Sequence, residues 1–174
     1  MFTFSREKML ILVFLLISTC FHISLLAGQS YWGIGMRQHS ENQLIEKYPF
    51  TDKDISFGIS YEYHDLGGYW LLTLNYAPEL KGTNSIKKVI SPGISLVMTE
   101  NNWKLGLGFQ KNYIQTEIGE NYWDDISWQL LTGYGLKLAG VLLDLYVFLP
   151  FTSFNDIRFK SNNLEYGIAA VFKF

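Results

Sequence analysis

Few residues in this chain could carry out chemistry. His39 and His64 are the two histidines that lie beyond the apolar N-terminal stretch. Ser40 directly follows His39, and a histidine beside a serine can take the hydroxyl proton in a hydrolase or acyltransferase. Ser153 and Asp156 lie in a polar stretch near the other end of the chain. They could complete such a site if the two ends of the fold meet.

A polar surface loop explains the same residues more simply. Adjacent side chains in an extended strand point to opposite faces, so His39 and Ser40 would diverge if both were in a strand. His64 stands beside the turn-forming residues 65–68, where we expect a solvated histidine. The sequence contains no metal-ligand cluster, phosphate-binding loop or paired-carboxylate signature. We therefore expect no cofactor or metal, and an enzyme is the less favoured interpretation.

Residues 1–30 have the features of a secretory signal peptide. Arg6 and Lys8 give a basic start, an apolar stretch runs from Met9 through Leu26, and small residues precede a cleavage position after Ser30. The predicted mature chain is one domain, residues 31–174. Lipid attachment at the only cysteine and retention as a membrane helix are alternatives, but polar residues interrupt the apolar stretch.

Charge and cysteine content narrow the function classes. Cys20, the only cysteine, lies in the predicted signal, so the mature domain would contain no disulfide. The formal net charge is −2 and no basic cluster occurs. This composition gives no reason to expect nucleic acid as a partner.

Alternation of large apolar side chains with small or polar ones predicts eight strands. They cover residues 32–37, 55–63, 70–76, 88–99, 103–109, 126–134, 141–149 and 164–174. A period of two indicates strands and not helices. Pro92 lacks a backbone donor, so we expect a distortion in the fourth strand. In the seventh strand, Asp144 and Tyr146 are placed on the face opposite Leu143 and Leu145.

The lengths of the connections also alternate. Residues 65–68, 99–102 and 137–140 form short turns, whereas residues 39–54, 78–87, 111–125 and 150–163 form long loops. The short turns would then share one rim of a closed sheet. This is the pattern of bacterial outer-membrane barrels, whose turns are periplasmic and whose long loops are extracellular.

The narrow interior of such a barrel predicts which face points inward. An eight-stranded barrel has little room beyond one filling of side chains, and the aromatic face would overfill it. The opposite face, rich in glycine, suits the interior. We therefore predict an all-β, transmembrane, eight-stranded antiparallel up-and-down barrel. Aromatic side chains at the strand ends would lie at the lipid interfaces: Trp32, Trp70, Tyr76, Trp103, Phe109, Trp128 and Tyr134.

Charged residues on the predicted inner face have both signs. They are Arg37, Glu62, Lys104, Asp144, Glu165 and Lys173. Unpaired charges in such an interior are costly, so we expect ion pairs, including one between Arg37 and Glu165 where the first and last strands meet. Long side chains in so narrow a space favour a plugged interior, with a narrow pore as the alternative.

The predicted long loops contain aromatic and acidic residues that could bind partners. The aromatic ones are Tyr48, Phe50, Tyr122, Trp123, Phe151, Phe154 and Phe159. Exposed aromatics could contact a host surface or lipopolysaccharide, or pack on the rim. The third loop also contains Glu117, Glu120, Asp124 and Asp125, which could hold divalent cations but are expected to form a solvated acidic loop.

With its signal peptide, amphipathic strands and terminal aromatic strand, the chain resembles the small outer-membrane barrels of Gram-negative bacteria. The resemblance implies that the barrel assembly machinery recognises the last strand, here through Tyr166, Phe172 and Phe174. Ala169 occupies the position where that family often has a glycine. The resemblance further implies a monomer in the cell outer membrane, in contact with lipid and lipopolysaccharide.

The resemblance identifies a cellular location and an architecture, and it leaves the activity open. We expect a structural, binding or adhesion role at the cell surface. The alternative is a lipid-modifying enzyme, because residues 37–42 distantly resemble the His-x-Ser-Asn core of outer-membrane lipid A deacylases. Here, however, the serine follows the histidine directly and the stretch lies near the start of the barrel.

Overall fold

The computed structural model describes residues 28–42, 45, 48–65, 67–78, 80, 86–138, 140–157 and 159–173. The predicted signal peptide lies almost wholly outside these residues, as does Phe174 of the predicted assembly signal. The first strand begins at Gln29, inside the predicted signal. Within the described residues, no helix has the length and apolar character needed to cross a membrane.

Ten strands and two short 3-10 helices make up the described regular structure. The strands are β1 (Gln29–Gln38), β2 (Ile55–Asp65), β3 (Gly68–Ala77), β4 (Ile86–Glu100), β5 (Trp103–Gln110), β6 (Tyr113–Thr116), β7 (Asn121–Trp123), β8 (Ser127–Leu138), β9 (Val141–Phe151) and β10 (Glu165–Lys173). The helices are η1 (Phe154–Asp156) and η2 (Ser161–Asn163). Both lie in the connection between β9 and β10.

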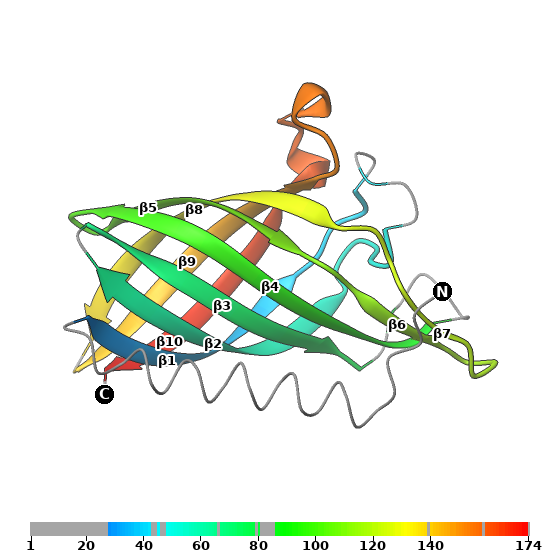
Figure 1. Cartoon of the computed structure of the whole chain (residues 1–174), viewed down its shortest axis with the longest axis horizontal. Coiled ribbons are helices and arrows are strands. Elements are labelled where there is room, and N and C mark those ends of the chain that lie inside the picture. The colour runs from blue at the N-terminus through cyan, green and yellow to red at the C-terminus, as the bar shows by residue number, and fades with distance from the viewer. Residues whose placement is uncertain are drawn as a thin grey trace.

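Eight of the strands form a closed antiparallel barrel. Around the ring the order is β1, β2, β3, β4, β5, β8, β9 and β10, and pairing of β1 with β10 closes it. The short β2–β3, β4–β5 and β8–β9 turns share one end, and the longer connections share the other (Figure 1). We call these the turn end and the loop end. The predicted all-β, eight-stranded antiparallel up-and-down barrel and its strand order are confirmed.

The third long connection is more regular than predicted. Residues 111–125 were expected to form a loop, but they contain β6 and β7. β6 pairs with β7 on one side and with the start of β4 on the other. This hairpin extends the wall beyond the loop end of the barrel (Figure 1). The prediction failed because the hairpin lacks a clear alternation of apolar residues, the signal on which the other strands were recognised.

Pro92 distorts the sheet on one side only. The β3–β4 ladder runs through it without interruption, with Leu74 opposite Pro92. On the other side, the β4–β5 ladder ends at Gly93 and Gln110, and the β4–β6 ladder resumes at Ile90 and Tyr113. In an antiparallel strand the N–H and C=O of one residue face the same neighbour. Pro92 has no backbone N–H, and the hydrogen bond that this group would donate is missing on the side of β5 and β6, where the ladder is interrupted.

The two faces of the wall have the predicted orientation. Apolar side chains such as Ile34, Ile59 and Leu105 are exposed on the outside, whereas Glu62 and Asp144 are buried inside. The aromatics predicted to lie at lipid interfaces are on the outer face, where Trp103 packs on Tyr134 and Phe109 on Trp128 across neighbouring strands. Asp144 and Tyr146 point inward, as their predicted phase required.

The interior is layered, and its middle is apolar. An inner cluster of Tyr69, Leu71, Val97, Leu131, Tyr146 and Phe148 fills the centre. A second cluster, formed by Phe50, Ala77, Val89 and Ile114, closes the loop end. A packed polar interior was predicted, so this apolar middle is a correction. It confines the charged side chains to two groups, one near each end.

We expect the glycines of the seam between β1 and β10 to differ in their tolerance of alanine. A Cβ added at Gly35 would lie 2.5 Å from the backbone oxygen of Ile168, which cannot retreat without disturbing the seam. A Cβ added at Gly167 would instead meet a ring carbon of Phe148 at 2.9 Å, and a side chain can rotate away. Gly35→Ala should therefore lower the free energy of unfolding by about 1–3 kcal/mol.

Gly167→Ala is the matched control and should cost clearly less. Urea unfolding of the refolded protein, followed by tryptophan fluorescence, measures both variants. Equal losses would show that the close backbone approach at Gly35 does not limit packing of the seam.

Candidate functional site

The strongest concentration of buried polar groups lies inside the barrel near the loop end. Arg37, at the end of β1, donates from Nε to Oε2 of Glu165, at the start of β10, at 2.6 Å. The Arg37 Nη1 atom also donates to Oε1 of Gln110 at 3.1 Å and to Oε1 of Gln129 at 3.0 Å. The structure thus contains the ion pair expected across the seam, and two strands on the far side of the barrel hold the same guanidinium.

The connection between β1 and β2 adds a histidine and two aromatic rings to this group. His39 Nδ1 lies 3.0 Å from Glu165 Oε2, and its Nε2 lies 2.9 Å from the hydroxyl oxygen of Ser56 in β2. Tyr48 donates its hydroxyl to Glu165 Oε1 at 2.7 Å. The ring of Phe50 stacks on the imidazole at 3.6 Å between centroids, with 4° between the planes.

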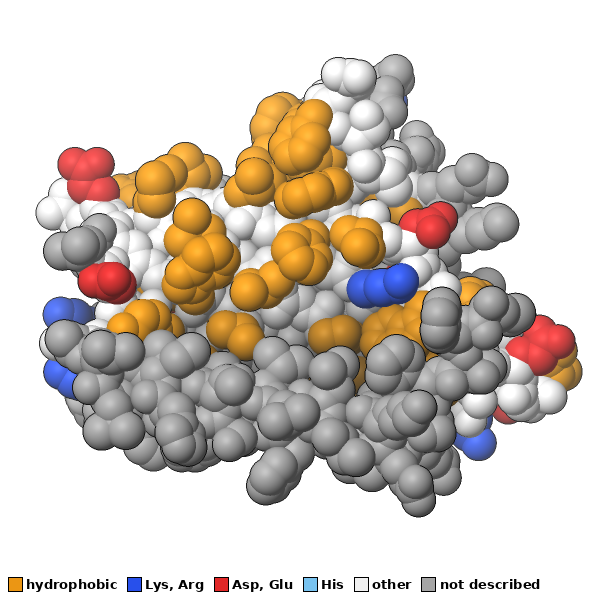
Figure 2. Space-filling model, viewed as in Figure 1, with side chains coloured by type: hydrophobic (Ala, Val, Ile, Leu, Met, Phe, Trp, Pro, Cys, Tyr) orange, Lys and Arg blue, Asp and Glu red, His pale blue; other side chains and the backbone are white. Residues whose placement is uncertain are grey.

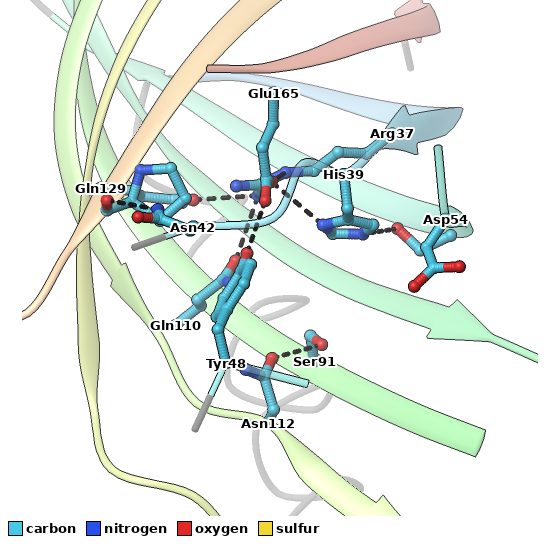
Figure 3. A network of polar contacts seen from close by, with 12 residues as sticks. Arg37, His39, Asn42, Tyr48, Asp54, Ser91, Gln110, Asn112, Gln129 and Glu165 are labelled. Atoms are coloured by element: carbon cyan, nitrogen blue, oxygen red, sulfur yellow. Dashed lines mark hydrogen bonds and ion pairs between the residues drawn. The ribbon is translucent and has the colours of Figure 1, made fainter. Parts of the chain in front are cut away.

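We call the polar members of this group the rim cluster: Arg37, His39, Tyr48, Ser56, Gln110, Gln129 and Glu165. Figure 3 labels all residues of the rim cluster except Ser56. Its members come from five strands and one connection, and all except Tyr48 are almost completely buried. Arg37, His39 and Glu165 were predicted as site residues from the sequence, and Tyr48 was predicted only as a loop aromatic. Ser56, Gln110 and Gln129 were not predicted as site residues. The inward phase of Ser56, Gln110 and Gln129 was available from the sequence, but which inward residues meet across the barrel depends on register.

The partners of His39 determine its tautomer. An ionised carboxylate can only accept hydrogen bonds, so Nδ1 carries the proton that is donated to Glu165. In a neutral imidazole the other nitrogen, Nε2, is then an acceptor, and the Ser56 hydroxyl donates to it. Burial, and next the negative charge of Glu165, raise the pKa of Tyr48 well above its ordinary value. Tyr48 therefore remains a donor to the carboxylate.

A second polar group occupies the turn end of the interior. Lys104 forms an ion pair with Asp144, which also accepts from the Tyr146 hydroxyl at 2.9 Å. The hydroxyls of Tyr146 and Tyr69 lie 3.0 Å apart. We call this the turn-end cluster, with Glu62 and His64 included.

His64 corrects one prediction made from the sequence. It was expected to be a solvated turn residue, but it is only half-exposed. Its Nε2 lies 2.7 Å from Glu62 Oε2, and its ring stacks on Tyr69 at 4.4 Å. Both contacts are possible because positions 62 and 64 share the inward face of β2.

Lys173 corrects a second prediction made from the sequence. It has the inward phase of β10 but lies at the strand end, where it is exposed, so it belongs to neither buried cluster. The other five residues predicted as a lumen charge network are buried. They form two separate groups with the apolar middle between them, and not one continuous network.

Neither of the serines predicted as partners of His39 hydrogen-bonds its imidazole in the described structure. Ser40 is buried, but its hydroxyl has no hydrogen-bond partner among the described residues. Ser153 caps η1 by accepting from the backbone N–H of Asn155 at 3.3 Å. The side chain of Asp156 lies outside the described part of the structure. Among the described residues, Ser56 and Glu165 are the ones that hydrogen-bond the imidazole of His39.

The acidic stretch in the third connection has a structural role at one position. Asp124 accepts from the backbone N–H and the side-chain amide of Asn112, each at 2.6 Å, and Asn112 accepts from Ser91 at 2.6 Å. Burial raises the pKa of Asp124. Within the described residues, no group of three or more histidine, cysteine or acidic side chains is arranged to hold a metal ion.

We expect the Arg37–Glu165 pair to behave as one unit in stability measurements. Arg37→Met leaves a buried carboxylate without its cation, and Glu165→Gln leaves a buried guanidinium without its anion. Each single variant should lose about 3–5 kcal/mol of unfolding free energy. The double variant removes both charges and should lose much less than the sum of the two.

Urea unfolding in lipid vesicles measures this cycle, and Lys173→Met serves as the control. Because Lys173 is exposed, its replacement should change stability by no more than about 0.5 kcal/mol. Additive losses in the double variant would contradict a coupled pair.

Comparison with known proteins finds distant structural likenesses only. No protein-family model matches the chain, and no curated protein matches it. A crystal structure of Neisserial surface protein A is 18% identical in sequence, with a TM-score of 0.47. The alignment covers 84% of this chain and 97% of that chain. No conclusion about function follows from this match.

Proposed function

We propose that the chain is a sealed outer-membrane barrel that spans the bilayer and acts at the cell surface through its loop end. The observation that supports this most strongly is the distribution of side chains across the wall. Large apolar residues are exposed around the outside, including Ile34, Phe57, Met98, Trp103 and Leu105, whereas ion pairs are buried inside. A water-soluble barrel would have the opposite arrangement.

The surface agrees with a bilayer as the surrounding medium. On the face seen in Figure 2, hydrophobic side chains gather along the middle of the barrel and acidic ones lie towards its two ends. Each square ångström of apolar surface that is removed from water stabilises the protein by about 25 cal/mol. Because every strand of the ring is paired on both sides, few backbone polar groups would face the hydrocarbon.

The packed interior supports a role that does not involve conduction. The rim cluster, the apolar middle and the turn-end cluster follow one another along the barrel, and Phe50 belongs to the apolar group that closes the loop end. These layers support the plugged interior and argue against the narrow pore. The surface role proposed here therefore depends on the outer surface of the barrel.

The loop end offers side chains suited to binding or adhesion. Ile118, at the tip of the β6–β7 hairpin, is 81% exposed, and Phe159 before η2 is 77% exposed. Tyr122 and Trp123 on β7 are also exposed. Lipopolysaccharide or a host surface would be the partner at this end. For assembly, Tyr166 and Phe172 present exposed rings on the outer face of β10, where the barrel assembly machinery would read them.

Arginine substitutions on the outer wall test the membrane-spanning arrangement. Ile59 lies in the middle of β2 and is 51% exposed. If lipid surrounds it, Ile59→Arg should destabilise the barrel in bilayers by about 2–4 kcal/mol. Ile118→Arg, beyond the wall, should have little effect. Urea unfolding in lipid vesicles measures both, and an unchanged stability for Ile59→Arg would contradict contact with lipid.

Planar bilayers test the sealed interior. We expect the refolded protein to produce no sustained conductance steps. Phe50→Ala should also remain silent, because the inner cluster still fills the barrel below the loop end. Stable open events in the wild-type protein would overturn the plugged interior and favour the pore.

A further inference from the structure

Ser56, His39 and Glu165 form a hydrogen-bonded line inside the loop end of the barrel. The Ser56 hydroxyl lies 2.9 Å from Nε2 of His39, and Nδ1 of the same ring lies 3.0 Å from a carboxylate oxygen of Glu165. We propose that these residues are the nucleophile, the general base and the orienting acid of a site that cleaves carboxylic esters. This activity goes beyond the surface role proposed above.

The geometry satisfies two requirements of such a site, a base for the nucleophile and a group that orients the base. A serine nucleophile needs a base within about 2.6–3.2 Å, and the base needs a third group that orients it. The carboxylate of Glu165 selects the imidazole tautomer whose free nitrogen faces Ser56. The three residues come from β2, the connection after β1, and β10, so only the closed barrel brings them together.

Two further atoms in the rim cluster are suited to stabilising an oxyanion. Nη2 of Arg37 and Nε2 of Gln110 are buried donors that make no hydrogen bond with the described residues. Arg37 is also the direct cross-strand partner of Ser56. A spare donor on the residue paired with the nucleophile, as on Arg37, is the kind of group that stabilises the negative charge formed when a carbonyl is attacked.

The proposed reaction conserves atoms and charge without any redox partner. Ser56 Oγ attacks the ester carbonyl carbon while its proton passes to Nε2 of His39. The carbon–oxygen bond to the alcohol then breaks, and the alcohol leaves with that proton. Water attacks the resulting acyl-serine, again giving a proton to His39, which returns it to Ser56 as the carboxylic acid departs.

Phe50 controls access to this line of residues. Its ring covers the imidazole of His39 in a stacked contact, and Ser56 is only 1% exposed. An ester therefore reaches Ser56 only when Phe50 moves aside. This arrangement predicts slow reaction in the resting protein and faster reaction once the ring is removed. The ester is either the acyl ester of a lipid beside the loop end or a small soluble ester.

The test uses the full chain refolded in detergent and a fluorophosphonate probe, which reacts with activated serines. Phe50→Ala should be labelled several-fold faster than wild type, with the adduct located on Ser56 by peptide mass spectrometry. Ser56→Ala should lose labelling. His39→Gln should slow it by about 10²-fold or more, the usual contribution of a general base.

Ser40→Ala is the matched control, since Ser40 is a buried serine next to His39 but outside the hydrogen-bonded line. It should be labelled like the wild type. Each variant is first shown to be folded by its heat-modifiable migration. Labelling of another serine, or none in both wild type and Phe50→Ala, overturns the proposal.

Turnover identifies the ester. The Phe50→Ala variant is assayed with p-nitrophenyl butyrate as the soluble ester and with a fluorescent acyl phospholipid as the lipid ester. Hydrolysis of either ester supports the proposal and shows whether the substrate is a soluble ester or a lipid ester. Hydrolysis of neither overturns the proposal. Because the probe assay works in detergent, its outcome does not depend on the Ile59→Arg test of membrane spanning.

Discussion

Pairing of the first and last strands is the contact on which the rest of the structure depends. Without the β1–β10 ladder the sheet would have two edges, and their unpaired backbone groups would be costly in an apolar surrounding. Arg37 and Glu165 lie on either side of this seam and join it by an ion pair. Gly35 lets the two backbones approach closely. Because the seam brings the two ends of the chain together, it also creates the rim cluster.

The narrow interior imposes the second constraint, which is volume. Glycine at inward positions makes room for long side chains from the neighbouring strand, as where Phe148 lies against Gly167 and Tyr146 against Gly133. The charged residues there have little contact with water, and four of them form two close ion pairs. Lys104 pairs with Asp144 at one end and Arg37 with Glu165 at the other. The apolar middle separates the two pairs, and so each must be satisfied locally.

The sequence predicted the wall well because side chains on its two faces differ so strongly. One charged residue, Asp144, was enough to establish the phase of a strand that is apolar on both faces. The β6–β7 hairpin was missed because it lacks that contrast. Contacts across the interior were less predictable. The Arg37–Glu165 pair could be anticipated because neighbouring strands follow from topology, but the meeting of His39 with Ser56 depends on how the long connection after β1 folds back over the rim.

The rim cluster would have to close the barrel and to support the proposed ester cleavage, and these two roles partly oppose each other. Glu165 is already neutralised by Arg37 when it accepts from His39, so it stabilises a protonated imidazole less than an unpaired carboxylate would. Proton transfer from Ser56 would create a second positive charge beside Arg37, in a region with little water. A site built this way should be a slow catalyst even when open. The same ion pair that closes the barrel thus limits the chemistry that the cluster can perform.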